Sequence, residues 1–176
     1  MREVAASRIL VAGIGNVFLG DDGFGVEVVA RLARRALPGG VEVADFGIRG
    51  FDLAYALMDG YQAAVLVDAL SRGGQAGDLF VVEPDLEKLD ETAGATVADG
   101  HGMDPVAVLK MVKQFGGRPP RLYVVGCEPG SLGGEQGEMG LSPPVAAALE
   151  GAVELVEDVV RRLLTPVETA GHKEVG

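Results

Sequence analysis

Two carboxylates and one imidazole stand where they could bind a metal ion. Asp22 lies in a glycine-rich segment beside Asp21, Asp68 follows five apolar residues, and His101 is flanked by glycines. Carboxylate oxygens and imidazole nitrogens form a mixed ligand set that suits a borderline divalent ion such as zinc or nickel. Because three protein ligands leave room for water or substrate, the pattern indicates an open rather than a structural metal site.

Each of these residues also has a simpler explanation when it is taken alone. Asp21 or Asp22 could cap the helix that follows, and Asp68 could end a strand by accepting hydrogen bonds from loop amides. A lone loop histidine such as His101 is more often an ordinary surface residue. The combination, with every member at a strand end or in the following loop, favours a site over three separate structural roles.

The segment from Gly13 to Gly25 occupies the position of a dinucleotide-binding turn, between a strand and a helix. The third glycine of that pattern would fall at Phe18, and the loop is too long for such a turn. Asp21 and Asp22 are stabilised as anions near a helix N-terminus, but they would repel a phosphate there. A non-catalytic, flavodoxin-like nucleotide- or phosphate-binding module is therefore the less favoured alternative.

Two further features follow predicted strands. Cys127 is the only cysteine, so no intramolecular disulfide can form, and its simplest interpretation is a core thiol. As a nucleophile it would need His101 within hydrogen-bond reach. Residues 45–50 follow the second predicted strand and would lie near the candidate metal site, mainly as a glycine-permitted turn, and Arg49 is a candidate contact for a substrate carboxylate.

The elements that must position these residues alternate between apolar runs and helical periodicity, the pattern of a parallel α/β sheet. Ligands bind outside the carboxyl ends of such strands, so Asp68 shares a crevice with Asp22 if the first and third strands are neighbours. The predicted strands cover residues 9–12, 41–46, 63–67, 78–83 and 122–126, and the predicted helices cover residues 25–36, 50–58, 105–115 and 143–164. Residues 85–100 form a predicted, partly ordered excursion, and residues 130–140 a glycine-rich, acidic loop.

The bulk composition describes one folded domain. The 176 residues are 48% hydrophobic and 23% charged, and we expect a single domain over residues 1–164 with a loose tail over 165–176. The formal net charge of -11 disfavours nucleic-acid and anionic membrane partners. With no signal peptide and no apolar run of spanning length, the protein is predicted to be cytoplasmic; we further expect a monomer.

The order of these motifs resembles one known family, the nickel–iron hydrogenase maturation endopeptidases. The resemblance covers roughly residues 8–164 and rests on Gly13-Ile14-Gly15-Asn16, Asp21-Asp22-Gly23-Phe24-Gly25-Val26, Asp45 to Gly50, Val67-Asp68-Ala69, His101, Gly126-Cys127-Glu128-Pro129 and Gly140-Leu141-Ser142-Pro143. It implies a three-layer α/β/α fold, with a mostly parallel, twisted sheet of about five strands and helices on both faces.

The same resemblance implies an activity, a partner and a site. The expected reaction removes a short C-terminal peptide from the hydrogenase large-subunit precursor after nickel is inserted, with nickel carried by the substrate and no organic cofactor. The nickel-contacting set of the family corresponds here to Asp22, Asp68 and His101. Several relatives have glutamate at the position of Asp22. Because aspartate is one methylene shorter, its carboxylate reaches about 1.5 Å less far than that of glutamate. Asp21 therefore stays open as an alternative.

The chemistry of the expected site leaves three schemes open. Nickel could act as a Lewis acid on the peptide carbonyl or on a water molecule. An aspartate could instead act directly as general base, as in an aspartyl protease, with nickel serving only recognition. A self-sufficient metallohydrolase with a permanently bound ion is the third alternative.

Overall fold

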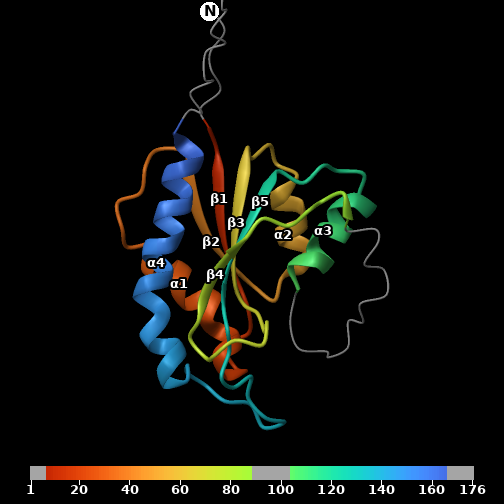
Figure 1. Cartoon of the computed structure of the whole chain (residues 1–176). Coiled ribbons are helices and arrows are strands. Elements are labelled where there is room, and N and C mark those ends of the chain that lie inside the picture. The colour runs from red at the N-terminus through yellow and green to blue at the C-terminus, as the bar shows by residue number, and fades with distance from the viewer. Residues whose placement is uncertain (1–6, 89–103, 166–176) are drawn as a thin grey trace, which may run out of the picture.

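The structure, a computed structural model, describes residues 7–88 and 104–165, and its centre is a twisted five-stranded sheet (Figure 1). The strands are β1 (Ile9–Ile14), β2 (Val41–Gly47), β3 (Ala63–Ala69), β4 (Leu79–Val82) and β5 (Arg121–Cys127). Their order in the sheet is β2-β1-β3-β5-β4. All neighbours are parallel except β4, which runs antiparallel to β5 at the edge. The predicted mostly parallel sheet is confirmed.

Helices cover both faces of this sheet, which confirms the expected three layers (Figure 1). One face carries α1 (Phe24–Leu32) and α4 (Pro143–Leu164), which pack against each other, and the other carries α2 (Gly50–Leu57) and α3 (Pro105–Gln114). A short 3-10 helix, η1 (Gly20–Gly23), precedes α1. Among the described residues, no helix has the length and apolar character needed to cross a membrane.

The two central strands are buried along their whole length. Every residue of β1 and β3 is buried, because helices shield both faces of a parallel sheet. Alternate side chains of β1 therefore enter two separate cores: Ile9 and Val11 pack with α1 and α4, whereas Leu10 and Ala12 pack with α2 and α3. This explains why β1 and β3 appear in the sequence as unbroken apolar runs.

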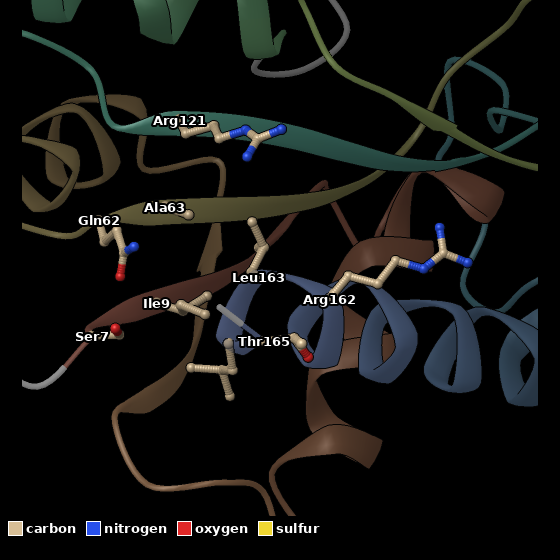
Figure 2. A pocket seen from close by; sticks show the side chains of 9 residues that line it. Ser7, Ile9, Gln62, Ala63, Arg121, Arg162, Leu163 and Thr165 are labelled. Atoms are coloured by element: carbon tan, nitrogen blue, oxygen red, sulfur yellow. The ribbon is translucent and has the colours of Figure 1, made fainter. Parts of the chain in front are cut away.

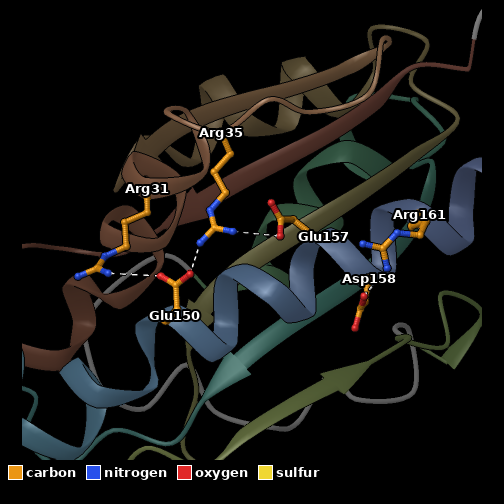
Figure 3. A network of polar contacts seen from close by, with 6 residues as sticks. All are labelled: Arg31, Arg35, Glu150, Glu157, Asp158 and Arg161. Atoms are coloured by element: carbon orange, nitrogen blue, oxygen red, sulfur yellow. Dashed lines mark hydrogen bonds and ion pairs between the residues drawn. The ribbon is translucent and has the colours of Figure 1, made fainter.

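The first helix is shorter than its periodicity predicts, because α1 ends at Leu32 and not near residue 36. The chain then tightens into turns, in which the amides of Arg34 and Arg35 donate to the carbonyls of Arg31 and Leu32. Two arginines at the end of α1 and in the following turn form ion pairs with glutamates of α4. Arg31 and Arg35 pair with Glu150, and Arg35 also pairs with Glu157 (Figure 3). These pairs are largely exposed, so each stabilises the α1–α4 contact by at most about 1 kcal/mol.

Glycines bring the start of α1 against the two central strands. A Cβ atom on Gly25 would lie 2.0 Å from the carbonyl oxygen of Val67 and 2.4 Å from that of Ile14. Gly15 has a φ of 136°, and a Cβ there would lie 1.8 Å from the carbonyl oxygen of Asp22. Because no side chain fits at these positions, the glycine-rich segment is explained by close packing, and that packing holds η1 over the ends of β1 and β3.

The strand order places a topological switch point between β1 and β3, where the expected crevice would lie. The chain leaves β1 for β2 on one side and then crosses to β3 on the other, so the connections after β1 and β3 diverge. In open α/β sheets, ligands bind outside the carboxyl ends of the strands at such a switch point. The condition for Asp68 to share a crevice with the loop after β1 is therefore met.

Candidate active site

Asp68 is a buried carboxyl near the carboxyl end of β3, only 4% exposed. Burial raises its pKa well above the ordinary aspartate value, and the nearby charges of Asp22 and Asp104 raise it further. The amide of Ala69 donates a hydrogen bond that opposes part of this shift. The ionised form of Asp68 is thus costly in the protein alone, and an arriving cation or proton would stabilise the site.

Asp22 supplies the second carboxyl of the crevice. It lies in η1, is 7% exposed, and its Oδ2 accepts a hydrogen bond from the amide of Asn16 at 2.8 Å. The Asn16 side chain in turn accepts a hydrogen bond from the amide of Phe18 at 2.9 Å. Because the charge of Asp22 raises the pKa of Asp68, the two carboxyls are electrostatic neighbours, and the structure brings together two of the three predicted site residues.

Asp21 has a different role, which the sequence did not reveal. Its fully buried carboxylate accepts four hydrogen bonds: from the amides of Gly130, Ser131 and Ser142 and from the Ser142 hydroxyl, at 2.6–2.8 Å. Burial alone would raise its pKa, but the hydrogen bonds from Ser142, Ser131 and Gly130 outweigh burial and lower it. Since a carboxylate offers about four lone-pair sites, Asp21 is engaged in anchoring the 130–142 loop, which favours Asp22 as the partner of Asp68.

Glu128 is a second buried acid with a structural role that sequence reasoning missed. It is 5% exposed and accepts hydrogen bonds from the Ser71 hydroxyl at 3.1 Å and the Arg72 amide at 2.7 Å. The Arg72 amide is the largest contribution to the lowering of its pKa. Glu128 therefore shapes the loop that follows β3. Its place directly after a buried strand, next to Pro129, was the available signal.

Cys127 is a core thiol, as predicted. Its side chain is fully buried among the residues that α1 and α4 cover. Burial raises the pKa of the thiol to about 11, and the charge of Asp21 adds to the shift. Because the thiolate is the nucleophilic form, Cys127 has no useful reactivity at neutral pH.

Substitution of this thiol tests that conclusion. We expect Cys127→Ala to keep proteolytic activity within about twofold of the wild type, and to lose roughly 1 kcal/mol of stability through the cavity that it leaves. Cleavage rates and thermal unfolding of the purified variant measure both effects. A complete loss of cleavage by a folded Cys127→Ala protein would instead identify the thiol as part of the chemistry.

Of the remaining candidate site residues, Arg49 makes contacts within its own turn and His101 lies outside the residues that the structure describes. His101 lies outside the described residues, as do most of the predicted excursion at 85–100 and all but the first residue of the predicted tail. Arg49 is exposed, and its guanidinium donates to the carbonyl oxygens of Phe46 and Asp45 and pairs with Asp52. These contacts stabilise the turn before α2. Within residues 7–88 and 104–165, no group of three His, Cys, Asp or Glu side chains could hold a metal ion.

A cavity of about 300 Å³, whose lining side chains are shown in Figure 2, lies at the amino end of β3, whereas Asp68 lies near its carboxyl end. It is lined by residues at the amino ends of three strands, Ile9, Ala63 and Arg121, and by the end of α4 around Leu163. Ligand sites of this fold class lie at the carboxyl ends of the strands. The chemistry-bearing residues and this cavity therefore occupy opposite edges of the sheet.

Comparison with known proteins agrees with the fold and with the family that the motifs resemble. The family model described as hydrogenase maturation protease matches residues 26–159. The hydrogenase 2 maturation protease of Escherichia coli K12 is 32% identical over 159 residues, covering 88% of this chain and 91% of that protein. The solved structure of the hydrogenase-maturating endopeptidase HybD from E. coli matches with a TM-score of 0.71 at 29% identity, covering 89% of this chain and 93% of that one.

A second solved structure extends the likeness to archaea. The hydrogenase 2 maturation peptidase of a Thaumarchaeota archaeon matches with a TM-score of 0.65 at 32% identity, and the match covers 88% of this chain and 98% of that one. The family match spans most of the chain and includes β3 with Asp68. The chain with the paired carboxyls Asp22 and Asp68 thus belongs to the hydrogenase maturation protease family, and it is a hydrolase of the endopeptidase type.

Proposed function

We propose that this protein removes a short C-terminal peptide from the precursor of a nickel–iron hydrogenase large subunit after nickel insertion. The observation that carries the proposal is the buried carboxyl pair of Asp22 and Asp68 at the carboxyl edge between β1 and β3. Nickel carried by the precursor is contacted by Asp22, Asp68 and His101, and no organic cofactor takes part. The protease acts as a monomer in the cytoplasm.

The electrostatics of the pair explain why the site would respond to a metal-loaded substrate. With its pKa raised by burial and by the charge of Asp22, Asp68 gains most when a cation enters the crevice. Because a nickel ion supplied by the precursor relieves the repulsion between the two carboxyls, productive docking depends on whether the precursor carries it. Cleavage then reports that nickel insertion is complete.

A second role for Asp68 is favoured by the same observation. An aspartate with a raised pKa is a stronger base than an ordinary one, and it remains useful only if its ionised form is available near neutral pH. Asp68 would in that case take a proton from the attacking water, with nickel polarising the peptide carbonyl or positioning the precursor. Both versions use the same residues and the same docked substrate.

The deciding experiment compares two forms of one precursor. The purified protein is incubated with nickel-loaded and nickel-free large-subunit precursor, and mass spectrometry of the precursor C-terminus follows the reaction. We expect cleavage of the loaded form only. Equal cleavage of both forms would contradict metal gating, and cleavage of neither would contradict the proposed function.

Metal analysis distinguishes a protease that uses nickel carried by its substrate from a self-sufficient metallohydrolase with its own bound ion. Protein purified without added nickel is expected to contain less than about one tenth of an ion per chain after chelation, because three ligands without those of a partner bind weakly. A stoichiometric ion that survives chelation would favour a resident metal.

A further inference from the structure

Two loops beside the site hold large apolar side chains in solvent. Phe18 is 60% exposed, Leu132 is 41% exposed and Met139 is 74% exposed. Phe18 lies four residues before Asp22 in the chain, and the other two belong to the loop that Asp21 anchors. We call these three residues the apolar rim.

The backbone of the apolar rim is tied together, so its exposure is built into the fold. Leu19 and Glu138 form a parallel bridge, in which the amide of Glu138 donates to Phe18 at 2.9 Å and the amide of Gly20 donates to Glu138 at 2.6 Å. The amide of Asp21 donates to the Ser131 carbonyl at 2.8 Å. Because these bonds restrain the loops, the rim residues cannot simply collapse onto the core, and such exposed apolar residues commonly mark an interaction site.

A cavity of about 230 Å³ adjoins the rim, between the start of α1 and the start of α4. Its apolar walls come from Val17, Leu141 and Leu149, and Ala146 of the first turn of α4 also lines it. Glu27 of α1 supplies a carboxylate at the same cavity. A partner segment with an apolar side chain next to a basic residue would match this lining, because the apolar group would contact the apolar walls and the basic group would lie near Glu27.

The segments that build this surface carry only negative charge, and Arg31, one turn after Glu27 on α1, is paired with Glu150 of α4. Residues 9–30 and 128–160, which build the rim and the cavity, contain no lysine or arginine. They do contain the acidic residues Glu27, Glu135 and Glu138. A second copy of this chain would bring the same acidic surface and be repelled, and an anionic lipid surface would be repelled as well. The complementary partner is a protein segment with apolar residues flanked by lysine or arginine.

We propose that the apolar rim and the adjoining cavity are a docking surface on which the hydrogenase large-subunit precursor seats an apolar side chain next to a basic residue. This rests on the proposed function, because that substrate must lie across the crevice of Asp22 and Asp68. The surface is continuous with that crevice: the Asn16 amide holds the Asp22 carboxylate, and the Asn16 side chain accepts from the amide of Phe18. Docking at the rim therefore positions the precursor over the carboxyl pair.

Filling the cavity tests the proposal with a matched control. Ala146 and Ala147 are adjacent exposed alanines of α4, and of the two only Ala146 lines the cavity. We expect Ala146→Phe to raise KM for the precursor, and Kd by titration calorimetry, by about tenfold with kcat within about twofold. Ala147→Phe should leave both constants unchanged. An unchanged KM and Kd in Ala146→Phe, or an equal rise in both variants, would overturn the docking surface.

A charge reversal gives an independent readout. Glu27→Lys and Glu154→Lys change the net charge equally, but only Glu27 lines the cavity. We expect Glu27→Lys alone to weaken precursor binding about tenfold at low salt, with a smaller effect at high salt because ions screen exposed charges. If both variants weakened precursor binding equally, the effect would come from net charge alone. That result would overturn the proposed pairing of Glu27 with a basic residue of the precursor.

The two proposals fail in different ways. Cleavage by the wild type tests the proposed function, whereas calorimetry with intact precursor measures docking without cleavage. A wild type that binds but never cleaves, together with weak binding by Ala146→Phe, would contradict the function and support the docking surface. Normal cleavage with unchanged binding in all variants would overturn only the docking surface.

Discussion

Replacing Asp68 with asparagine is expected to abolish processing while raising the stability of the protein. Asparagine preserves the size of the side chain but removes the charge that would bind nickel or accept a proton, so the cleavage rate should fall by at least about 100-fold. The same change removes a buried ionisable group whose ionised form is penalised by burial and by Asp22. We expect a gain of about 1 kcal/mol at pH 7, or roughly 2–4 °C in Tm.

The pH dependence of this gain follows from the direction of the shift. The pKa of Asp68 is raised in the folded protein, so the folded state binds the proton more tightly than the unfolded state. Stability is lost as pH rises from the ordinary aspartate pKa of about 3.9 through the raised folded value. The advantage of Asp68→Asn should therefore be absent below about pH 4, grow with pH and become constant above the folded pKa. Calorimetric unfolding of both proteins from pH 4 to pH 8 measures it.

Two further variants control this experiment. Asp158→Asn removes a half-exposed carboxylate of α4 that pairs with Arg161; it should leave processing unchanged and cost at most about 0.5 kcal/mol, because exposed helical ion pairs contribute little. His101→Ala should abolish processing in the same way as Asp68→Asn, because both belong to the proposed nickel-contacting set. Normal processing by either Asp68→Asn or His101→Ala, followed by mass spectrometry of the precursor, would contradict that set.

Replacing Asp21 with alanine is expected to have the largest effect on stability. The change leaves the amides of Gly130, Ser131 and Ser142 without their acceptor in a buried position. Charge-assisted hydrogen bonds contribute about 1.5–3 kcal/mol each and are not additive, so we expect a loss of about 3–5 kcal/mol. Processing should fall at least about tenfold even where the variant is folded, since the loop anchored by Asp21 no longer supports η1 and Asp22.

The two aspartates should respond to pH in opposite directions. The pKa of Asp21 is lowered in the folded protein, so its contribution is present above the ordinary aspartate pKa and is lost as pH falls through the lowered folded value. The stability difference between wild type and Asp21→Ala should thus shrink at acid pH. Asp21→Asn, which keeps one oxygen acceptor, should lie between the two proteins. Denaturant titrations at several pH values give these differences, and a wild-type midpoint for Asp21→Ala would disprove the anchoring role.

Much of the fold could be predicted because its signals are local. The continuous apolar runs of β1 and β3 follow from burial on both faces, and Asp104 with Pro105 marks the start of α3, where the Asp104 carboxylate accepts from the Val106 amide at 2.9 Å. The antiparallel direction of β4 was not predicted. The strand has only four residues, of which three are half-buried and Val81 is exposed. Nothing in such a strand encodes whether its neighbour runs parallel or antiparallel.

The candidate site was likewise predicted only in part, where local sequence signals were sufficient. Residue type and position near strand ends were enough to pick out Asp68 and the adjacent acids Asp21 and Asp22 as candidates, because ligands of parallel sheets bind at the carboxyl ends of the strands. The sequence could not separate Asp21 from Asp22, since both are aspartates next to a helix start. That distinction depends on Ser142, which lies 121 residues away in the chain and whose amide and hydroxyl both donate to the Asp21 carboxylate.

The sequence by itself thus determined the α/β class, the approximate positions of the strands and the acids that are candidates for the site, since these depend on patterns within a few residues. Only the tertiary structure decided which acid anchors a loop, that the pKa of the Cys127 thiol is raised, and that the loops that hold Phe18, Leu132 and Met139 are paired. The physical reason is that hydrogen bonding, burial and pKa depend on groups far apart in the chain, which only folding brings into contact.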